Sequence, residues 1–404
     1  MHVELHPRFA DTSAGQRARE LTSACVHCGF CLATCPTYLD QRDERDSPRG
    51  RIYLIKQLLE TGGASAVTHT HLDRCLTCRS CETTCPSGMQ YGELLDIGRG
   101  LMEREVPRGM LQRAVRSLLR FVLTRPRLFG LLLLAGRPLR PLLPASLSRK
   151  IPGRQELKPV PGVRDTKRTV LLLEGCVQSA ATPRTNNATR RIMARLGIDL
   201  VSVREAGCCG AVNYHLAAQH DGLDDLRRNI DAWWAHIEAG AEAIVTSASG
   251  CGAMLADYAH LLADDPIYAE RARRVTELAA DVGQFLTKED LSGLVFNTDI
   301  GPVAVQTPCT LQHGLGEPQL LTDLLQCLGF TLAATRENHL CCGSAGTYSI
   351  LQPGTSARLR ENKLRALTRE GPAVIATANV GCQLHLAAAT EIPVVHWIEL
   401  LDNA

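Results

Sequence analysis

Eight of the 17 cysteines in this chain of 404 residues occur in two copies of the spacing Cys-x2-Cys-x2-Cys-x3-Cys-Pro. The first copy runs from Cys25 to Pro36 and the second from Cys75 to Pro86. Three thiolates separated by two residues on a tight loop can face three irons of one cubane cluster, which is typical of [4Fe–4S] ligation. A structural zinc site would use two separated Cys-x2-Cys pairs instead. The spacing therefore predicts iron–sulfur chemistry.

The fourth cysteine of each copy is predicted to bind the cluster of the other copy. It lies further along the chain and precedes a proline, so it points away from the first three, as in two-cluster ferredoxins. We assign one cluster to Cys25, Cys28, Cys31 and Cys85, and the other to Cys75, Cys78, Cys81 and Cys35. This crossed ligation would hold the two copies side by side, so that electrons can pass between neighbouring clusters.

Eight further cysteines form a second duplicated pattern in the C-terminal half. Each copy has one cysteine, then a Cys-Cys-Gly triplet, then a fourth cysteine, and matched cysteines lie 131 to 133 residues apart. The two copies are Cys176, Cys208, Cys209 and Cys251, and Cys309, Cys341, Cys342 and Cys382. Four thiolates can hold an iron–sulfur cluster or a zinc ion. The alternative is that these thiols only pack as small apolar side chains.

Apolar runs precede several of these cysteines, as in VLLLEGC and AEAIVTSASGC. Such runs are typical of buried parallel strands, and the segments 185–196 and 356–368 that follow have helical character. Each copy is therefore predicted to be a small α/β unit with cysteines at the carboxyl ends of strands, where open sheets place ligand sites. Cys327 has no counterpart in the first copy, and we expect it in the core on a helix.

The segments around the first two motifs are predicted to be helical. Ser47 can cap a helix that Gly62 ends, and residues 91–105 have the pattern of a closing helix. Every iron position already has a cysteine, so nearby histidines are expected at the surface or beside the ligands. These histidines are His27, His69 and His71.

The sequence thus predicts a multidomain α+β protein. Residues 1–105 form an α-helical domain with two [4Fe–4S] clusters, and residues 106–166 form a basic, apolar connector and linker. Residues 167–295 and 296–404 form two tandem α/β cysteine-rich repeats.

The connector has an unusual composition. Residues 106–150 carry ten Lys and Arg and no Asp or Glu, with leucines and phenylalanines between them. This is typical of an amphipathic helix at a membrane surface, and the alternative is a helical hairpin packed on the protein or on a partner subunit. Nucleic-acid binding is not favoured, because the leucine-rich faces lack polar base-reading side chains. The longest purely apolar run, 128–136, is too short to span a membrane, which takes about 20 residues.

Composition narrows the class of protein. A net charge of +2 and 45% hydrophobic residues are ordinary for a globular chain. Residues 1–10 are polar and mixed, so we expect no signal peptide and an intracellular chain whose cysteines bind metal. No Gly-x-Gly-x-x-Gly follows a predicted strand, so a fingerprint for NAD or FAD is missing. Such a chain is predicted to conduct electrons rather than to oxidise a substrate itself.

These motifs resemble those of the cysteine-rich (CCG-domain) iron–sulfur subunits that carry a two-[4Fe–4S] ferredoxin domain. Within that group, the sequence is most similar to the iron–sulfur subunits of glycolate oxidase (glycolate dehydrogenase) complexes. The similar stretches span nearly the whole chain and include ACVHCGFCLATCPTY, SPRGRIYLIKQLLE, HLDRCLTCRSCETTCPSG, EAGCCGAVNYHL, SASGCGA, HLCCGSAGTYS and TANVGCQLHLA.

The resemblance implies an electron-transfer subunit of a bacterial oxidoreductase that acts on the CH–OH group of glycolate or a related 2-hydroxy acid. It implies that FAD and substrate oxidation belong to a partner subunit. It also implies electron flow toward the respiratory quinone pool, from a cytoplasmic complex peripherally associated with the inner membrane.

One departure bears on an alternative function, a reductase that acts on a disulfide or a quinone at the CCG sites. The fuller CCG pattern ends in Cys-x2-Cys, and the first position of that pair is Ala248 in one repeat and Asn379 in the other. Each repeat therefore has four candidate ligands instead of five. This difference argues against chemistry of the heterodisulfide reductase type.

Overall fold

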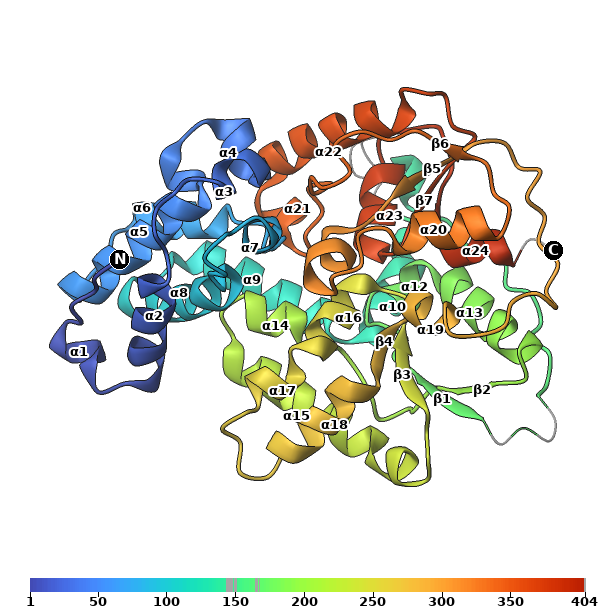
Figure 1. The fold of residues 1–404 in the computed structure, drawn as a ribbon, viewed down its shortest axis with the longest axis horizontal. Helices are drawn as coiled ribbons and strands as arrows, with labels where there is room; N and C mark the ends of the chain where they lie inside the picture. Colours follow the sequence, from blue (N-terminus) through green and yellow to red (C-terminus); the bar gives the residue numbers. More distant parts are fainter. Residues whose placement is uncertain (143–147, 149–150, 164–165, 167, 403–404) are drawn as a thin grey trace.

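The computed structural model describes residues 1–404 except 143–147, 149–150, 164–165, 167 and 403–404. Arg149 and Lys150 of the basic connector, and residue 167 at the expected start of the first repeat, therefore lie outside the described residues. A helical N-terminal part lies beside a larger body that contains two sheets (Figure 1).

Short helices build the N-terminal part. They are α1 (Pro7–Ala10), α2 (Ser13–Ser23), α3 (Cys31–Thr34), α4 (Pro36–Gln41), the 3-10 turn η1 (Glu44–Asp46), α5 (Pro48–Thr61), α6 (Ala66–Asp73), α7 (Ser80–Thr83) and α8 (Tyr91–Glu105). The two longest helices, α5 and α8, pack against each other and supply most of the apolar core of this part.

Helix α5 lies between the two ferredoxin-type motifs, as predicted. Ser47 Oγ accepts a hydrogen bond from the backbone N–H of Gly50 at 2.9 Å, and such a cap contributes about 1 kcal/mol. Gly62 ends the helix with φ of 70°, which the sequence also predicted. Helix α8 has the predicted bounds of 91–105.

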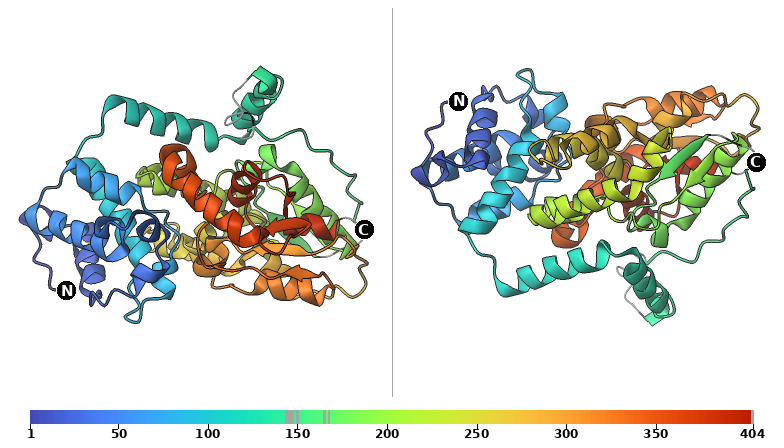
Figure 2. Two further views of the ribbon diagram at one scale, coloured as in Figure 1. Left: turned by 90° about the horizontal axis from the view of Figure 1, so that it is seen from above. Right: turned by 90° about the horizontal axis from the view of Figure 1, so that it is seen from below.

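The connector forms two helices and a short turn on one side of the molecule (Figure 2). They are α9 (Met110–Leu123), α10 (Pro126–Gly136) and the 3-10 turn η2 (Arg140–Leu142). Neither α9 nor α10 contains a buried residue, although α10 packs against α12 (Gln178–Ala181) of the first repeat.

Each cysteine-rich repeat contains a four-stranded parallel sheet. The first has the order β2-β1-β3-β4, and the second has the matching order β6-β5-β7-β8. The strands are β1 (Thr169–Leu172), β2 (Asp199–Val201), β3 (Ala243–Thr246), β4 (Ala279–Asp281), β5 (Val303–Gln306), β6 (Leu332–Ala333), β7 (Val374–Thr377) and β8 (Val394–His396). The register is also matched, since Val170 pairs with Ala243 and Val303 pairs with Val374. The predicted duplication and parallel strands are thus confirmed.

Helices cover both sheets. In the first repeat they are α12, α13 (Pro183–Arg195), α14 (Ala211–His215), α15 (Gln219–Glu238), α16 (Ser249–Ala256), α17 (Tyr258–Leu261), α18 (Ala269–Leu278) and α19 (Val282–Leu286). In the second they are the π-helical turn η3 (Thr310–Gly314), α20 (Leu320–Cys327), α21 (Tyr348–Leu351), α22 (Pro353–Thr368), α23 (Val380–Ala387) and α24 (Trp397–Leu401). The helices predicted at 185–196 and 356–368 correspond to α13 and α22.

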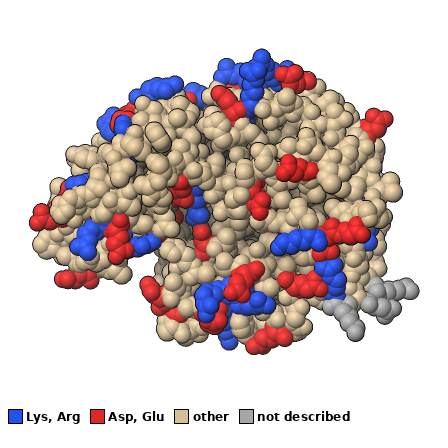
Figure 3. Space-filling view, viewed as in Figure 1, with Lys and Arg blue, Asp and Glu red and all other residues tan. Residues whose placement is uncertain are grey.

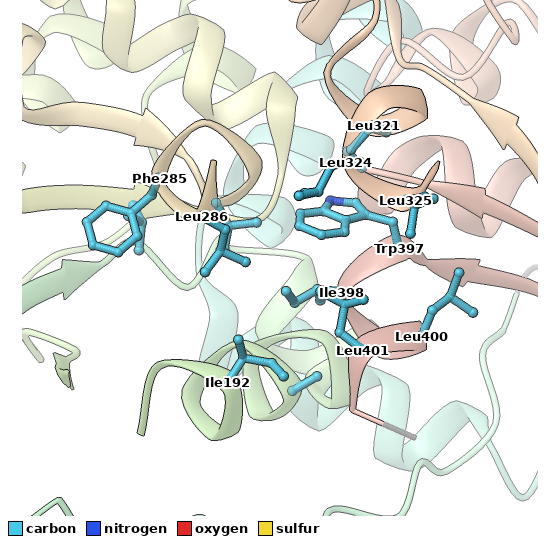
Figure 4. Close-up of a cluster of buried hydrophobic side chains, with 14 of the residues drawn as sticks. Ile192, Phe285, Leu286, Leu321, Leu324, Leu325, Trp397, Ile398, Leu400 and Leu401 are labelled. Atoms are coloured by element: carbon cyan, nitrogen blue, oxygen red, sulfur yellow. The ribbon is translucent and has the colours of Figure 1, made fainter. Parts of the chain in front are cut away.

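The two repeats share one apolar core (Figure 4). One face of each sheet contributes to it, for example Val170 of β1 and Val305 of β5. Trp397 of the C-terminal helix α24 is fully buried there, near Leu286 and Leu321. The opposite face of each sheet packs under the helices of its own repeat. The repeats therefore form one body, which the sequence did not predict.

On the face seen in Figure 3, basic and acidic side chains are intermixed rather than separated into areas of one sign. Many basic side chains of the protein form ion pairs with acidic ones. Arg168, for example, lies 2.8 Å from Glu242 and 2.7 Å from Glu289.

Candidate iron–sulfur centres

The two cysteine motifs, which we call the first cassette (Cys25 to Cys35) and the second cassette (Cys75 to Cys85), share one loop conformation. Matched positions have positive φ, with His27 and Thr77 at 55°, Gly29 at 86° and Arg79 at 58°. Residues other than glycine seldom adopt this conformation. Turns with such residues aim successive backbone N–H groups into a concavity that suits anions, including the sulfides of iron–sulfur clusters. Both loops are thus shaped to receive a cluster.

Each predicted set of ligands lines one pocket. Cys25, Cys28, Cys31 and Cys85 line the first pocket, and Cys35, Cys75, Cys78 and Cys81 line the second. Cys81 and Tyr91 border both pockets, so the two sites are neighbours. The structure therefore brings the crossed sets together, and an all-thiol donor set fits iron–sulfur clusters.

The two pockets differ in exposure. Cys28 of the first site is exposed, and the adjacent Val26 and Phe30 are 65% and 61% exposed. Three ligands of the second site, Cys35, Cys75 and Cys81, are buried. The first site therefore lies at the surface, whereas the second lies between the first site and the rest of the protein.

A buried cation lies beside the second site. Arg51 of α5 is 1% exposed, and its guanidinium donates hydrogen bonds to the backbone oxygen of His71 at 2.7 Å and to Oγ1 of Thr37 at 3.1 Å. It is close enough to Cys35 and Cys75 to interact with them electrostatically. A positive charge here offsets part of the negative charge that four thiolates bring into a buried site.

Asp46 holds this charged network together. Its carboxylate accepts hydrogen bonds from Arg74 at 2.8 Å and from Arg51 at 3.5 Å, and it lies 2.8 Å from Nδ1 of His71. His71 was expected either at the surface or beside the ligands. It is buried, and it lies beside the second site. His69 is also buried.

Burial makes the cassette thiols hard to ionise without a metal. It raises the pKa of Cys31 to about 11, and it raises the pKa values of Cys78 and Cys81 well above their usual range with help from neighbouring sulfurs. Burial also acts on Cys85, but hydrogen bonds from Ser87 and nearby backbone N–H groups outweigh it and lower that pKa. Because iron binds the thiolate, cluster binding must displace these protons.

The four cysteines of each repeat meet in a row at the carboxyl ends of strands, as predicted. In the second repeat, Sγ of Cys309 lies 3.8 Å from Sγ of Cys341, and Sγ of Cys342 lies 3.2 Å from Sγ of Cys382. In the first repeat, the next sulfur in the matching order Cys176, Cys208, Cys209 and Cys251 helps burial to raise the pKa of each of the first three thiols.

The spacing of the sulfurs distinguishes between a zinc ion and a larger cluster. Three thiolates on one tetrahedral zinc would lie about 3.8 Å from each other, given Zn–S bonds of about 2.3 Å. Within the described part of the chain, no three cysteine sulfurs all lie within 4.8 Å of one another. The rows of thiols are therefore too extended for a single zinc ion without rearrangement.

The second cassette packs directly against the cysteines of the second repeat. Leu76 and Cys341 belong to one buried apolar cluster with Tyr348 and Leu359, and Cys78 and Cys309 pack against it. The first repeat instead meets the N-terminal domain through polar contacts. Those contacts include Arg79 with Asp257 at 3.2 Å, His215 with Asp96 at 3.1 Å, and His260 with Glu93 at 3.3 Å.

The sequence did not predict the contacts of two residues near the repeat cysteines. Lys363 of α22 is 3% exposed, and burial lowers its pKa while the four sulfurs of the second repeat oppose that shift. Asn379, where the fuller CCG pattern has a cysteine, donates a hydrogen bond through Nδ2 to Sγ of Cys382 at 3.6 Å. The duplication offered a signal for Lys363, because the matched position in the first repeat is the apolar Ile230.

Cys327 corrects another expectation. It is exposed at the end of α20 and is not part of the core. Leu321, Leu324 and Leu325 turn the apolar face of α20 inward, and Cys327 lies off that face.

Comparisons with known proteins agree with this arrangement. Residues 21–89 match a family described as 4Fe-4S dicluster domain, and residues 170–256 and 303–387 match the family described as Cysteine-rich domain, CCG. Over its full length the chain is 50% identical to the glycolate oxidase iron-sulfur subunit of Escherichia coli (strain K12), and the match covers 99% of that protein.

More distant relatives match as well. The probable glycolate oxidase iron-sulfur subunit of Bacillus subtilis (strain 168) is 30% identical over 94% of this chain and 93% of its own length. Lactate utilization protein A of Halalkalibacterium halodurans is 25% identical over 58% of this chain and 96% of its own length. The resemblance inferred from the motifs is thereby confirmed. The chain belongs to the family of glycolate oxidase iron–sulfur subunits.

Proposed function

We propose that this chain relays electrons within a complex that oxidises glycolate or a related 2-hydroxy acid. The electrons come from a partner FAD subunit, where the substrate is oxidised, and leave toward the respiratory quinone pool. The observation that carries the proposal is that the two crossed sets of four cysteines line adjoining pockets. The printed name of the relative from Escherichia coli supports the choice of glycolate.

Two [4Fe–4S] clusters bound in these pockets would supply one-electron redox chemistry. The chain's own residues hold them through the eight cysteines, exclude water at the second site, and balance charge there through Arg51. Tyr91, which borders both pockets and is 4% exposed, keeps the space between the sites dry. A dry, rigid gap favours electron transfer because little solvent must reorganise.

The exposed loop of the first cassette is the proposed contact for the flavin subunit. Val26 and Phe30 present apolar side chains next to the exposed Cys28. An electron can reach a cluster from another protein only where that cluster comes close to the surface. Electrons would therefore arrive at the first cassette and move inward to the second.

The connector supports peripheral attachment of a cytoplasmic complex to the inner membrane. Helix α9 turns two of its arginines toward the protein, with Arg116 pairing with Asp73 at 2.8 Å and Arg120 with Asp221 at 3.2 Å. Large apolar side chains point outward instead, and the exposed ones between 110 and 142 are Met110, Leu111, Leu118, Phe121, Leu131, Leu132, Leu134, Leu139 and Leu142. Among the described helices, none is both long and apolar enough to cross a bilayer. An apolar face flanked by further arginines suits the surface of an anionic membrane.

The repeats are proposed to hold further redox centres. Their rows of four thiols, three of them buried in each repeat, suit a polynuclear iron–sulfur cluster better than a single zinc ion. One observation favours the second candidate function, a reductase acting on a disulfide or a quinone, because the sulfurs of Cys342 and Cys382 already lie 3.2 Å apart. If Cys209→Ser and Cys342→Ser leave electron delivery to quinone unchanged while both cubane clusters remain, that candidate is wrong.

The proposal is tested on the anaerobically purified complex by iron and sulfide analysis and low-temperature EPR. Addition of glycolate should produce the signals of two reduced [4Fe–4S] clusters, and only when the flavin subunit is present. Cys85→Ser should remove one of these signals, whereas Cys327→Ser, at an exposed cysteine outside both sets, should remove neither. An iron-free chain that still supports turnover would refute the proposal.

A further inference from the structure

The two repeats match each other in sheet order and in their rows of cysteines, but their surroundings differ in charge. In the first repeat, Ile230 of α15 is fully buried in one apolar cluster with Cys176 and Cys208. In the second repeat, the matched residue is Lys363 of α22, which is also buried. At this matched position the first repeat therefore has an apolar side chain, and the second has an amine.

Lys363 is held in place by the loop that leads to the cysteines of its repeat. Its Nζ donates hydrogen bonds to the backbone oxygens of Glu337 at 2.9 Å and of Asn338 at 3.3 Å. It interacts electrostatically with all four sulfurs of the second repeat. A fixed positive charge stabilises the more negative, reduced form of a neighbouring redox centre, and so raises its potential.

The repeats also differ in how they reach the second cassette. Cys78 packs against the apolar cluster that contains Cys341, and its sulfur interacts electrostatically with that of Cys309. The first repeat meets the N-terminal domain through ion pairs such as Arg79 with Asp257. The apolar cluster that both Cys78 and Cys309 pack against therefore leads from the second cassette to the second repeat.

Asn379 joins the two repeats at their cysteines. Its Nδ2 donates to Sγ of Cys382 at 3.6 Å, and its Oδ1 accepts a hydrogen bond from the backbone N–H of Gly250 at 3.4 Å. Gly250 directly precedes Cys251 of the first repeat. A short bonded path thus connects a ligand candidate of one repeat with a ligand candidate of the other.

We propose that the two repeat centres work in series. The second repeat takes electrons from the second cassette, with Lys363 as the positioning residue that makes it the stronger acceptor, and the first repeat exchanges electrons through the second by way of Asn379. Each step moves one electron, so the donor centre is oxidised as the acceptor centre is reduced. The flavin partner supplies the electrons, and a quinone removes them. This inference rests on the proposed function, because it requires redox centres in the repeats.

The first test is an EPR-monitored redox titration of the full, cluster-loaded chain. Cys309→Ser identifies the signal of the second repeat by its loss. Lys363→Met should lower the ratio of reduced to oxidised second-repeat centre about tenfold at a fixed potential, about 59 mV for one electron. The signals of the cassettes and of the first repeat should keep their potentials. Lys363→Arg should retain most of the wild-type value, and Ile230→Met, at the matched position, should leave the second repeat unchanged.

The second test is rapid-freeze EPR of the complex with its flavin subunit after mixing with glycolate. The second repeat should become reduced before the first. Asn379→Ala should slow reduction of the first repeat several-fold, whereas Arg191→Met should not. Arg191 is a suitable control because its Nε contacts Oδ1 of Asp402 at 2.6 Å across the interface between the repeats, and neither residue is next to a cysteine in the sequence.

Three results would overturn the inference. They are an unchanged second-repeat potential in Lys363→Met, reduction of the first repeat before the second, and an iron content of about eight per chain with no centre in either repeat. None of these results touches the two cassette clusters. Failure of the proposed function would instead appear as cassette clusters that glycolate and the flavin subunit do not reduce.

Discussion

Nη2 of Arg116 lies 2.8 Å from Oδ2 of Asp73, and this contact turns the charged side of α9 toward the protein. Arg108 binds the same carboxylate, which holds the start of the connector to α6. Burial raises the pKa of Asp73, but the surrounding arginines outweigh it and lower that pKa. Leu111, Leu118 and Phe121 of α9 face outward, whereas an ordinary surface helix turns such side chains toward the core.

The outward-facing apolar side chains of α9 predict that the complex loses membrane binding when two of them are replaced by glutamate. Leu111→Glu combined with Leu118→Glu should release the complex from vesicles of anionic lipid, because both side chains are more than half exposed and glutamate is repelled by such lipids. Cosedimentation measures the release, and the cluster EPR signals should not change. Ile267→Glu, at a 70% exposed residue outside the connector, is the control. Continued binding of the double variant would show that the face covers a protein instead.

Crossed ligation predicts which substitutions share a phenotype. Cys85→Ser should weaken the same EPR signal as Cys25→Ser, although 60 positions separate the two residues, because both line the first pocket. Cys35→Ser should match Cys75→Ser for the second pocket. Iron analysis should show a loss of up to four irons in each case. Pairing within each cassette, with Cys35 grouped with Cys25, would contradict the assignment.

Arg51 predicts a large stability effect at the second site. Arg51→Met should lower the free energy of unfolding of the loaded chain by about 3 kcal/mol, because it leaves the fully buried Asp46 with less compensation. Anaerobic urea unfolding measures this. Arg49→Met serves as the control, since Arg49 pairs with the largely exposed Glu44 and such pairs contribute less than about 1 kcal/mol. Equal losses in the two variants would argue against a special role for burial.

His396 predicts that acid weakens the joined repeats. Its Nε2–H donates to the backbone oxygen of Ser247 at 2.7 Å, and its Nδ1 accepts from the N–H of Ile398 at 3.2 Å, so only the neutral ring makes both bonds. Burial lowers the pKa of His396 to about 3. A lowered folded pKa gives stability that is present above about pH 6.5 and is lost as pH falls toward 3.

Between pH 7.5 and 5.5 this histidine alone should cost about 1.4 kcal/mol of unfolding free energy. The neighbouring Trp397 offers a fluorescence signal for urea titrations at the two values of pH. The His396→Gln variant keeps a hydrogen-bond donor and acceptor but does not titrate. The unfolding free energy that it loses between pH 7.5 and 5.5 should therefore be smaller by that amount. Identical pH dependence in the two proteins would remove His396 from the explanation.

The sequence predicted those features that depend on local spacing. The crossed sets follow from the motif rule, the helix from Ser47 to Gly62 follows from its caps, and the parallel strands follow from apolar runs before cysteines. Periodicity could also have placed Cys327 correctly, because it lies off the apolar face of α20.

Features that depend on contacts between distant segments could not be predicted in this way. Lys363 lies near Cys309 only because α22 packs across β5, and Arg51 meets Cys75 only because α5 lies under both cassettes. The direction in which α9 presents its leucines depends on Asp73, which belongs to another helix. A single sequence contains the residues of these contacts but not their pairing.

The exposed sulfur of Cys28 makes the outer cluster the more vulnerable of the two to air. Dioxygen and chelators meet that cluster first, whereas the buried cysteines shield its inner neighbour. Protein handled in air should therefore lose the cluster of the first cassette before that of the second. It should stay folded, but it should no longer accept electrons from the flavin subunit. A preparation that is still brown and folded can thus be inactive in electron transfer from its partner.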